Sequence, residues 1–377
     1  MNAPVDWQQA ENVLCVRLDA LGDVLMTMPA LRALKQSRPG RRLTLLTSPG
    51  AAALVPLVPE IDDHIVYDAP WMKATAPRRD SRPEFAMIER LRRRRFDAAV
   101  IFTVFSQNPL PAALLCLLAD IPRRLAHCRE NAYQLLTDWV QEPEPEQFIR
   151  HEVRRQLDLV ATVGCRTTNE RLSLSVPAEA TRRVRAILHE WDLANGQPWV
   201  LIHPGASAPS RRYPPERFAE AAELLAREHD LPIIFSGSDG ERELIESIRA
   251  AMSAAAHSLA GRLCLAELAA LVALAPVLVT NNTGPAHIAA AVGTPVVDLY
   301  AQTNPQHTPW QVAQRVLYHD VPCKNCFKSV CPQEHHDCLA RVPPDAVAQA
   351  ALELLAGSRC QPGHPLLALQ VGNTGGW

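Results

Sequence analysis

Two aspartates near the N-terminus stand where a carboxylate can act on a substrate. The apolar run Asn12–Arg17 is typical of a buried strand, and the turn after it carries Asp19, Gly22 and Asp23. Asp23 opens a helical pattern, so we expect its side chain beyond the strand end, where a general base would take a proton from a hydroxyl. Asp19 is the second candidate for this role. The structural alternative is that Asp23 only caps the helix.

A second strand–turn–helix junction, Thr280–His287, has the composition of an anion-binding site. Thr283 can cap the helix, Gly284 lets a phosphate approach the backbone, and Pro285 suits the first helical turn. Exposed amide N–H groups and the helix dipole would favour a diphosphate at this position. The structural alternative is a well-capped helix without a ligand.

Two further turns carry groups that would suit a nucleotide. The turn His203–Ser207 precedes Arg211 and Arg212, and either cation would neutralise phosphate charge. Glu241 stands at a helix start, where its carboxylate would accept hydrogen bonds from ribose hydroxyls or complement the helix dipole. Taken alone, each of these residues is expected to have an ordinary structural role.

Short apolar runs alternate with helical patterns along the chain, and the alternation restarts near Pro198. Strands are expected at 12–17, 42–47, 65–67, 96–103, 198–203, 231–235, 277–280 and 295–300. This alternation predicts parallel sheets, and 377 residues exceed the roughly 250–300 that one core supports. We therefore predict an α/β protein with two Rossmann-like, doubly wound domains facing across a ligand-binding cleft.

The expected domain boundary falls in the passage Arg166–Val176. We expect an N-terminal domain at 1–175 and a C-terminal domain at 176–356, the latter including a Cys-rich segment at 323–338. The remainder, 357–377, is rich in Gly and Pro and is expected to be a flexible tail.

Composition narrows the classes of function. The net charge of −2 argues against an electrostatic nucleic-acid binder. The polar N-terminus lacks the pattern of a signal peptide, and no uncharged apolar stretch reaches 18 residues. We therefore expect a cytoplasmic protein. The basic run Glu89–Arg95 would face anionic lipid headgroups or, as the alternative, form a solvated helix face.

Taken together, the three junctions resemble the signature segments of glycosyltransferase family 9, the heptosyltransferases. The resemblance rests on Val16–Arg32, on His203–Ser207 with Arg211–Phe218, and on Asn282–His287 with Gly293–Val297. Order and spacing agree over about Asn12–Leu355.

The resemblance implies a GT-B fold and an inverting, metal-independent transfer that requires no cofactor. It implies that a heptose moves from ADP-heptose, a nucleotide-sugar donor, to a lipid-anchored core oligosaccharide of lipopolysaccharide, with contact to the cytoplasmic face of the inner membrane and none to nucleic acid. By position, Asp23 matches the catalytic base. The positions that match donor-binding residues are Ser207, Arg211, Glu241, Asn282, Thr283, Gly284 and His287.

In the resembled family the N-terminal half handles the acceptor, so candidate acceptor contacts are Trp71–Lys73, Gln107–Asn108 and Cys128–Trp139. Two positions depart from the family pattern. Asn282 stands where an Asp is often found, and Arg211 where a Lys often contacts donor phosphate. Asn282 leaves open the same fold using a UDP or GDP hexose. A separate alternative is a nucleotide-sugar binding or assembly protein without catalysis, in which the Cys cluster is an interaction module.

Cys323, Cys326, Cys331 and Cys338 form the tight pattern C-x2-C-x4-C-x6-C. Four closely spaced thiolates in a reducing compartment suggest a structural Zn²⁺ site. The alternative is a loop of free thiols.

Overall fold

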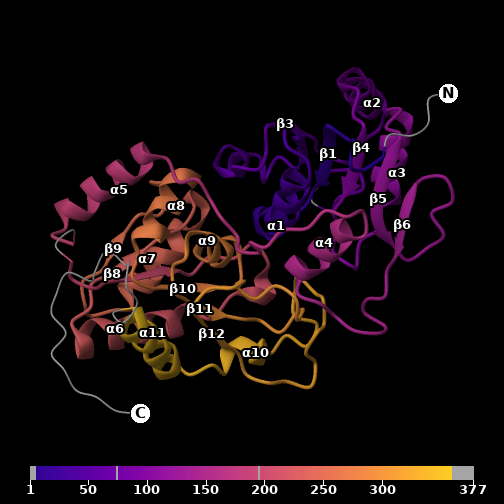
Figure 1. Ribbon diagram of the computed structural model, residues 1–377. Helices are drawn as coiled ribbons and strands as arrows, with labels where there is room; N and C mark the ends of the chain where they lie inside the picture. Colours follow the sequence, from indigo (N-terminus) through magenta and orange to yellow (C-terminus); the bar gives the residue numbers. More distant parts are fainter. Residues whose placement is uncertain (1–5, 74, 194–195, 359–377) are drawn as a thin grey trace, which may run out of the picture. The chain divides into compact units, whose positions relative to one another are not determined.

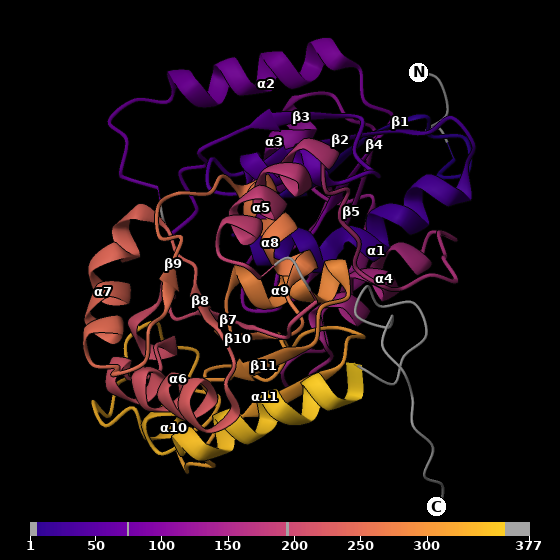
Figure 2. The same ribbon diagram turned by 90° about the vertical axis from the view of Figure 1, so that its left-hand side faces the viewer.

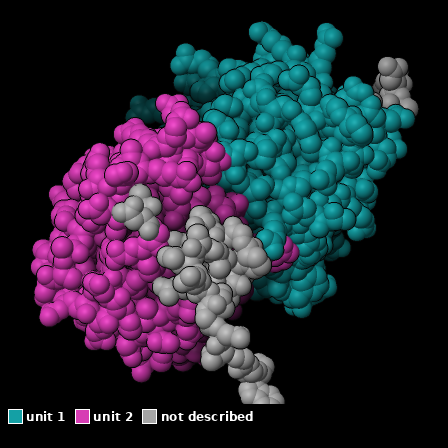
Figure 3. Space-filling model, turned by 60° about the vertical axis from the view of Figure 1, so that its left-hand side comes forward, with its two compact units in different colours: residues 1–175 teal, residues 176–377 magenta. Residues whose placement is uncertain are grey.

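The central strands of each sheet are short and apolar, and their side chains are buried on both faces. In β1 (Asn12–Arg17), every side chain from Val13 to Val16 is almost completely buried, as expected when helices cover both faces of a parallel sheet. The computed structural model describes residues 6–73, 75–193 and 196–358. The chain divides into two units, residues 1–175 and 176–377 (Figure 3).

The first unit contains a six-stranded, all-parallel sheet with the order β3-β2-β1-β4-β5-β6 (Figure 1). Its other strands are β2 (Arg42–Thr47), β3 (Asp63–Val66), β4 (Ala98–Ile101), β5 (Arg123–Cys128) and β6 (Asp138–Gln141). Its helices are α1 (Leu21–Ser37), α2 (Arg82–Arg94), α3 (Leu110–Leu118) and α4 (Glu152–Ala161), with a 3-10 helix at Ala52–Leu57.

The second unit repeats this architecture, with the order β12-β11-β10-β7-β8-β9. Its strands are β7 (Val200–His203), β8 (Ile233–Phe235), β9 (His257–Ser258), β10 (Leu278–Asn281), β11 (Val296–Leu299) and β12 (Gln314–Leu317). Its helices are α5 (Ala178–Glu190), α6 (Pro215–His229), α7 (Arg242–Ala250), α8 (Leu265–Leu274), α9 (Gly284–Val292), α10 (Asp337–Ala340) and α11 (Pro344–Ser358), with 3-10 helices at Pro209–Arg211 and Asp239–Glu241.

Helices cover both faces of each sheet. In the first unit α1 packs against α4 and α2 packs against α3. In the second, α6 lies between α7 and α11 on one face, while α8 contacts α5 and α9 on the other (Figure 2). In both sheets the strand order reverses beside the first strand, between β1 and β4 and between β7 and β10. Ligands of doubly wound proteins bind at the carboxyl ends of strands at such a reversal.

The prediction of two Rossmann-like α/β domains is confirmed. Four strands were not predicted: β5, β6, β9 and β12. Between β2 and β3, the segment Ala52–Leu57 forms a 3-10 helix. Helix α11 extends to Ser358, and residues 359–377 of the predicted tail lie outside the described residues.

One charged residue lies inside the apolar strand β11. Asp298 is fully buried, and burial raises its pKa to about 8, against the opposing effects of a hydrogen bond from Asn282 and the charge of Arg211. Asn282 Nδ2 lies 3.0 Å from Asp298 Oδ2 and 2.8 Å from the carbonyl oxygen of His307. An amide at 282 can donate to Asp298, whereas a second carboxylate there would repel it.

This burial predicts a pH dependence of stability. A carboxyl group whose pKa is raised on folding makes its full contribution to stability when the pH is below its unfolded pKa. That contribution is lost as the pH rises towards the folded pKa, which for Asp298 is about 8. The substitution Asp298→Asn keeps the shape of the side chain, and the amide is neutral at every pH of the experiment. The free energy of unfolding of the wild type should therefore fall by about 1–2 kcal/mol relative to the variant between pH 6.5 and 8.

Thermal and urea unfolding of both proteins at pH 5, 6.5 and 8 measures this difference. Other titrating groups contribute equally to both proteins and cancel. Parallel stability curves across the three pH values would show that Asp298 is already ionised in the folded state.

Candidate active site

One buried guanidinium at the carboxyl end of β1 holds three carboxylates. Arg17 Nε lies 2.9 Å from Asp19 Oδ2, and its Nη2 lies 3.1 Å from Asp23 Oδ1. Its Nη1 lies 2.9 Å from Oε1 of Glu152, the first residue of α4. Burial opposes the charge of Arg17, but the three carboxylates outweigh burial and raise the pKa of the guanidinium above its ordinary value. The cluster has more negative than positive groups.

Burial makes Asp23 a weak acid, and the neighbouring carboxylates add to this effect. Its pKa is raised to about 6 by burial and by the nearby charges of Asp19 and Glu152, while Arg17 acts in the opposite direction. The side chain of Asp23 is 19% exposed, compared with 10% for Asp19 and 0% for Glu152. Asp23 is therefore the carboxylate of this cluster that solvent, or a substrate, reaches most readily.

Local structure fixes the position of Asp23. Asp23 is in the first turn of α1, and its Oδ2 accepts a hydrogen bond of 3.2 Å from the amide of Ala20, the N-cap residue. The capping role considered from the sequence thus accounts for one carboxylate oxygen, and the other faces Arg17. This arrangement holds a carboxylate at the switch point in one orientation.

Asp19, the second candidate, is held on several sides. It pairs with Arg17, and it accepts a hydrogen bond from Gln107 Nε2. The hydroxyl of Ser48 donates to its backbone carbonyl at 2.7 Å. Its side chain is therefore better suited to positioning its neighbours than to exchanging protons with a substrate.

In the second unit, Asn281 joins the two loops that carry the candidate donor contacts. Its Nδ2 donates to the carbonyl of Pro204 at 2.7 Å, and its Oδ1 accepts from the amide of Tyr213 at 3.0 Å. Thr283 follows as the N-cap of α9, with an extended backbone and no side-chain capping bond. Thr283 and Gly284 are half-buried, so the start of α9 is partly open to solvent.

Arg211 supplies positive charge near this helix start. It lies at the end of a 3-10 helix, and its charge lowers the pKa of both Asp298 and Tyr300 against the effect of their burial. Ser207, in the same loop, is exposed. Arg212 instead donates from Nε to the carbonyl of Ala206 at 2.8 Å and so anchors the loop. Of the two arginines, Arg211 is the one whose guanidinium has no hydrogen-bond partner within the described part of the chain.

Glu241 lies beside the end of β7. Its Oε2 accepts hydrogen bonds of 2.7 and 2.8 Å from the amide and hydroxyl of Ser238, and it lies 3.9 Å from His203 Nε2. A Cβ atom at Gly205 would stand 1.8 Å from Glu241 Oε1, so only glycine allows this close approach. The capping role accounts for Oε2, while Oε1 faces the glycine turn.

Two other candidate donor contacts are buried. Asn282 uses its amide group to bond Asp298 and the His307 carbonyl, so a donor contact from its side chain would have to use Oδ1. His287, in the first turn of α9, is 4% exposed.

The four clustered cysteines are half-buried and influence one another electrostatically. Burial, together with the charges of Cys331, Cys323 and Cys326, raises the pKa of Cys338. Cys323 Sγ lies 3.7 Å from His335 Nε2. Among the described residues, no three His, Cys, Asp or Glu side chains are close enough together to hold a metal ion.

The Cys-rich segment also contacts the Arg211 turn. The hydroxyl and amide of Ser210 donate to the carbonyls of Lys328 and Ser329 at 2.8 and 3.1 Å. The conformation of the segment therefore bears on where Arg211 points.

The sequence identified Asp19 and Asp23 but not Arg17 and Glu152, the groups that set the charge of the cluster. An arginine ending an apolar run was a usable signal for Arg17. Glu152 is 135 residues away from Arg17, and no local pattern connects them. Asp298 was also missed, although a lone carboxylate within the apolar run 295–300 was visible.

Comparison with known proteins identifies the family of this chain. A model of glycosyltransferase family 9 (heptosyltransferase) matches residues 84–336. Lipopolysaccharide heptosyltransferase 2 of Salmonella typhimurium is 25% identical over 91% of this chain and 98% of its own length. Lipooligosaccharide heptosyltransferase 2 of Campylobacter jejuni is 30% identical over 44% of this chain, a match that spans about half (54%) of that relative.

The fold also has a close solved counterpart. The structure of the Escherichia coli ADP-heptose lipopolysaccharide heptosyltransferase II superposes with a TM-score of 0.72 at 23% identity, covering 93% of this chain and 100% of that one. The predicted GT-B fold is thereby confirmed. The family model matches well over half of the length of this chain, so the chain belongs to glycosyltransferase family 9.

Proposed function

We propose that this protein is an inverting heptosyltransferase that moves a heptose from ADP-heptose to the core oligosaccharide of a lipopolysaccharide. Family membership supports the reaction class, and the names of the full-length relatives support the sugar and the acceptor. The observation that carries the proposal is Asp23, a partly exposed carboxylate with a pKa raised to about 6 at the switch point of the first sheet.

In this proposal Asp23 is the general base. The acceptor hydroxyl attacks the anomeric carbon of the donor, the new C–O bond forms as the bond to the diphosphate breaks, and the hydroxyl proton passes to Asp23. A pKa of about 6 keeps the carboxylate mostly ionised at neutral pH and still gives it more basicity than an ordinary aspartate. Arg17 keeps the carboxylate in place.

The second unit binds the donor. The start of α9, at Thr283 and Gly284, offers backbone amides and the positive end of a helix dipole to the diphosphate. Arg211 adds a cation to stabilise the leaving group, and Ser207, His287 and Glu241 are further donor contacts. Because amides and a guanidinium meet the developing charge, the proposed reaction routes no step through a metal ion.

Asn282 does not favour a different nucleotide. Its departure from the family pattern was the reason to consider a UDP or GDP hexose. Its amide hydrogens bond Asp298 and the His307 carbonyl, so its identity is explained by packing within the second sheet.

The direct test is product analysis. Wild-type protein, incubated with ADP-heptose and a heptose-deficient core acceptor, should yield a product heavier by one heptose residue in mass spectrometry. Asp23→Asn should lower kcat by about 10²–10⁴-fold, because it removes the proton acceptor while preserving shape. The wild-type rate should rise through pH 6 and level off above it.

Asp19→Asn is the matched control, since it changes the other exposed carboxylate on Arg17. It should lower kcat less than Asp23→Asn does. Donor affinity, measured by thermal shift with ADP, should be similar in all three proteins. An Asp23→Asn variant that turns over at the wild-type rate rules out Asp23 as the base, and transfer from UDP or GDP sugars alone rules out the proposed donor.

We also infer that α2 and α3 face an anionic membrane surface. Arg92 Nε lies 2.7 Å from Asp120 Oδ2, and its Nη2 donates to the Leu118 carbonyl at 2.5 Å, so the C-terminal ends of the two helices are adjacent. Phe85 is 66% exposed and lies on the same stripe of α2 as Arg92. Three exposed leucines of α3 add apolar surface: Leu114, Leu117 and Leu118.

The charge of α2 supports a lipid partner. Arg90 and Arg93 are exposed on α2, where Arg93 also pairs with Glu89, and arginines on a helix that carries exposed apolar groups suit an interface of anionic headgroups. Among the described residues, no helix combines the length and apolar composition needed to cross a bilayer. Binding would therefore occur at the lipid surface.

Vesicle sedimentation tests this surface. The wild type should bind vesicles containing phosphatidylglycerol more strongly than phosphatidylcholine vesicles. Arg90→Glu with Arg93→Glu should weaken binding by about 10-fold or more. Arg182→Glu with Arg185→Glu makes the same charge change on exposed positions of α5 and should have little effect. Equal losses in the two double variants would indicate only a response to net charge.

For the Cys-rich segment we propose a structural Zn²⁺ bound by Cys323, Cys326, Cys331 and Cys338. The support is four mutually interacting thiols in one segment, although their side chains are not arranged as a ready-made ligand set. Elemental analysis of protein purified under reducing conditions should find about one zinc per chain. Zinc well below one equivalent would favour the alternative of free thiols.

A further inference from the structure

A small pocket opens beyond the carboxyl ends of β4 and β5, within the first unit. It has a volume of about 70 Å³, and its lining includes Phe105, Gln107, Asn108, His127 and Glu142. Most of these side chains are polar. A space of this size takes a few water molecules or a similarly small part of a larger ligand.

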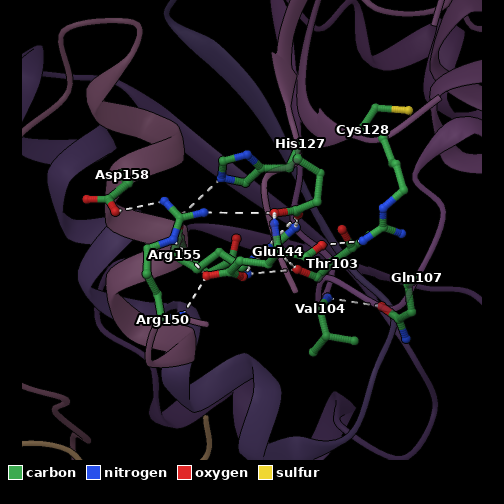
Figure 4. A network of polar contacts seen from close by, with 12 residues as sticks. Thr103, Val104, Gln107, His127, Cys128, Glu144, Arg150, Arg155 and Asp158 are labelled. Atoms are coloured by element: carbon green, nitrogen blue, oxygen red, sulfur yellow. Dashed lines mark hydrogen bonds and ion pairs between the residues drawn. The ribbon is translucent and has the colours of Figure 1, made fainter. Parts of the chain in front are cut away.

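His127 is the informative group in this pocket. It is 3% exposed, and its Nε2 lies 3.3 Å from the backbone carbonyl oxygen of Arg155 (Figure 4). A carbonyl oxygen only accepts hydrogen bonds, so Nε2 carries the hydrogen. Burial, together with the charges of Arg155 and Arg150, lowers the pKa of His127 to about 3, so the ring is neutral at physiological pH.

The tautomer then fixes what the pocket can recognise. In a neutral ring with its hydrogen on Nε2, Nδ1 is a hydrogen-bond acceptor. Nδ1 of His127 is buried and has no hydrogen-bond partner within the described residues. A ligand group that reaches Nδ1 must therefore donate a hydrogen. Ionised phosphate and carboxylate cannot donate a hydrogen to Nδ1, whereas a hydroxyl can. The lining also carries the charged side chains of Arg129, Glu130 and Glu142.

The remaining lining groups suit a hydroxyl, which both donates and accepts. Asn108 Oδ1 accepts from the amide of Leu110 at 2.8 Å, which leaves the Asn108 amide hydrogens for a ligand oxygen. Glu142 is anchored by Arg155, whose Nε lies 3.1 Å from Glu142 Oε2, so its carboxylate is a fixed acceptor. A neutral hydroxylated group matches these donors and acceptors.

The pocket is connected to the proposed base. Gln107 lines the pocket, and its Oε1 accepts from the amide of Val104 at 3.2 Å (Figure 4). Its Nε2 donates to Asp19. Asp19 and Asp23 share the guanidinium of Arg17. One chain of side-chain contacts therefore links the pocket to the carboxylate that would receive the proton.

We propose that this pocket is an acceptor subsite that binds a hydroxyl-bearing part of the acceptor sugar, with Nδ1 of His127 accepting a hydrogen bond from that hydroxyl. The assignment rests on the proposed function, because it takes the ligand to be the glycan acceptor. His127 is a specificity-determining residue in this account, and Asp23 remains the base.

Two substitutions separate ligand recognition from structural support. In His127→Asn the side-chain oxygen takes the place of Nδ1, and the hydrogen bond to the Arg155 carbonyl is lost. In His127→Gln the side-chain amide takes the place of Nε2, which keeps that bond and removes the acceptor at Nδ1. The probe is a de-O-acylated, heptose-deficient core oligosaccharide with saturating ADP-heptose.

His127→Gln should raise KM for the core oligosaccharide about 10-fold, with kcat and KM for ADP-heptose within about twofold of the wild type. His127→Asn should keep KM for the oligosaccharide within about threefold. The reverse pattern would show that His127 only supports Arg155, and unchanged KM in both variants would show that the pocket holds water alone. Either result overturns the subsite.

A binding measurement separates this inference from the proposed reaction. In protein with ¹⁵N-labelled histidine, Nδ1 of His127 should move upfield when the core oligosaccharide is added without donor, as an acceptor nitrogen does on gaining a hydrogen bond. Sodium phosphate at the same concentration should cause no such shift. Heptose transfer without the oligosaccharide shift overturns the subsite alone, whereas a shift without transfer counts against the reaction and leaves the subsite standing.

Discussion

The structure of the first unit depends on one buried cation shared by three carboxylates. A guanidinium fully removed from water is stable only with charged partners, and Arg17 has Asp19, Asp23 and Glu152. Three partners are more than one cation can neutralise. Burial, together with the charges of Asp19 and Glu152, raises the pKa of Asp23, the most exposed of the three carboxylates, against the charge of Arg17. Burial of Arg17 and basicity of Asp23 are therefore consequences of the same arrangement.

The sheet topology brings these groups together. In both units the strand order reverses beside the first strand, and the loops after β1 and β4, or after β7 and β10, lie at the same edge. Asp19 and Asp23 follow β1, Gln107 follows β4, and Glu152 begins α4. In the second unit Asn281 joins the corresponding loops with two hydrogen bonds. Positions far apart in the sequence thus form one site in each unit.

The sequence alone predicted those elements and site residues whose pattern lies within a few neighbouring residues. Asp23, the start of α9 and the central strands follow from apolar runs, glycines and helix starts over a few residues. The missed strands β6, β9 and β12 have four residues or fewer and are only partly buried, and β5, although six residues long, begins with two arginines and contains a histidine, so an apolar pattern does not distinguish them. The partners of Arg17, the orphan nitrogen of His127 and the bond between Asn282 and Asp298 join distant segments, and only the tertiary structure reveals them.

The most direct test of this account is the titration of the Asp23 carboxyl carbon by ¹³C NMR in wild-type protein and in Glu152→Gln. The account predicts a wild-type midpoint near pH 6 and a lower midpoint in the variant, because the substitution removes one negative charge and leaves Arg17 in place. A wild-type midpoint near the ordinary value of 3.8, unchanged in the variant, would contradict the claim that burial and the neighbouring carboxylates make Asp23 basic.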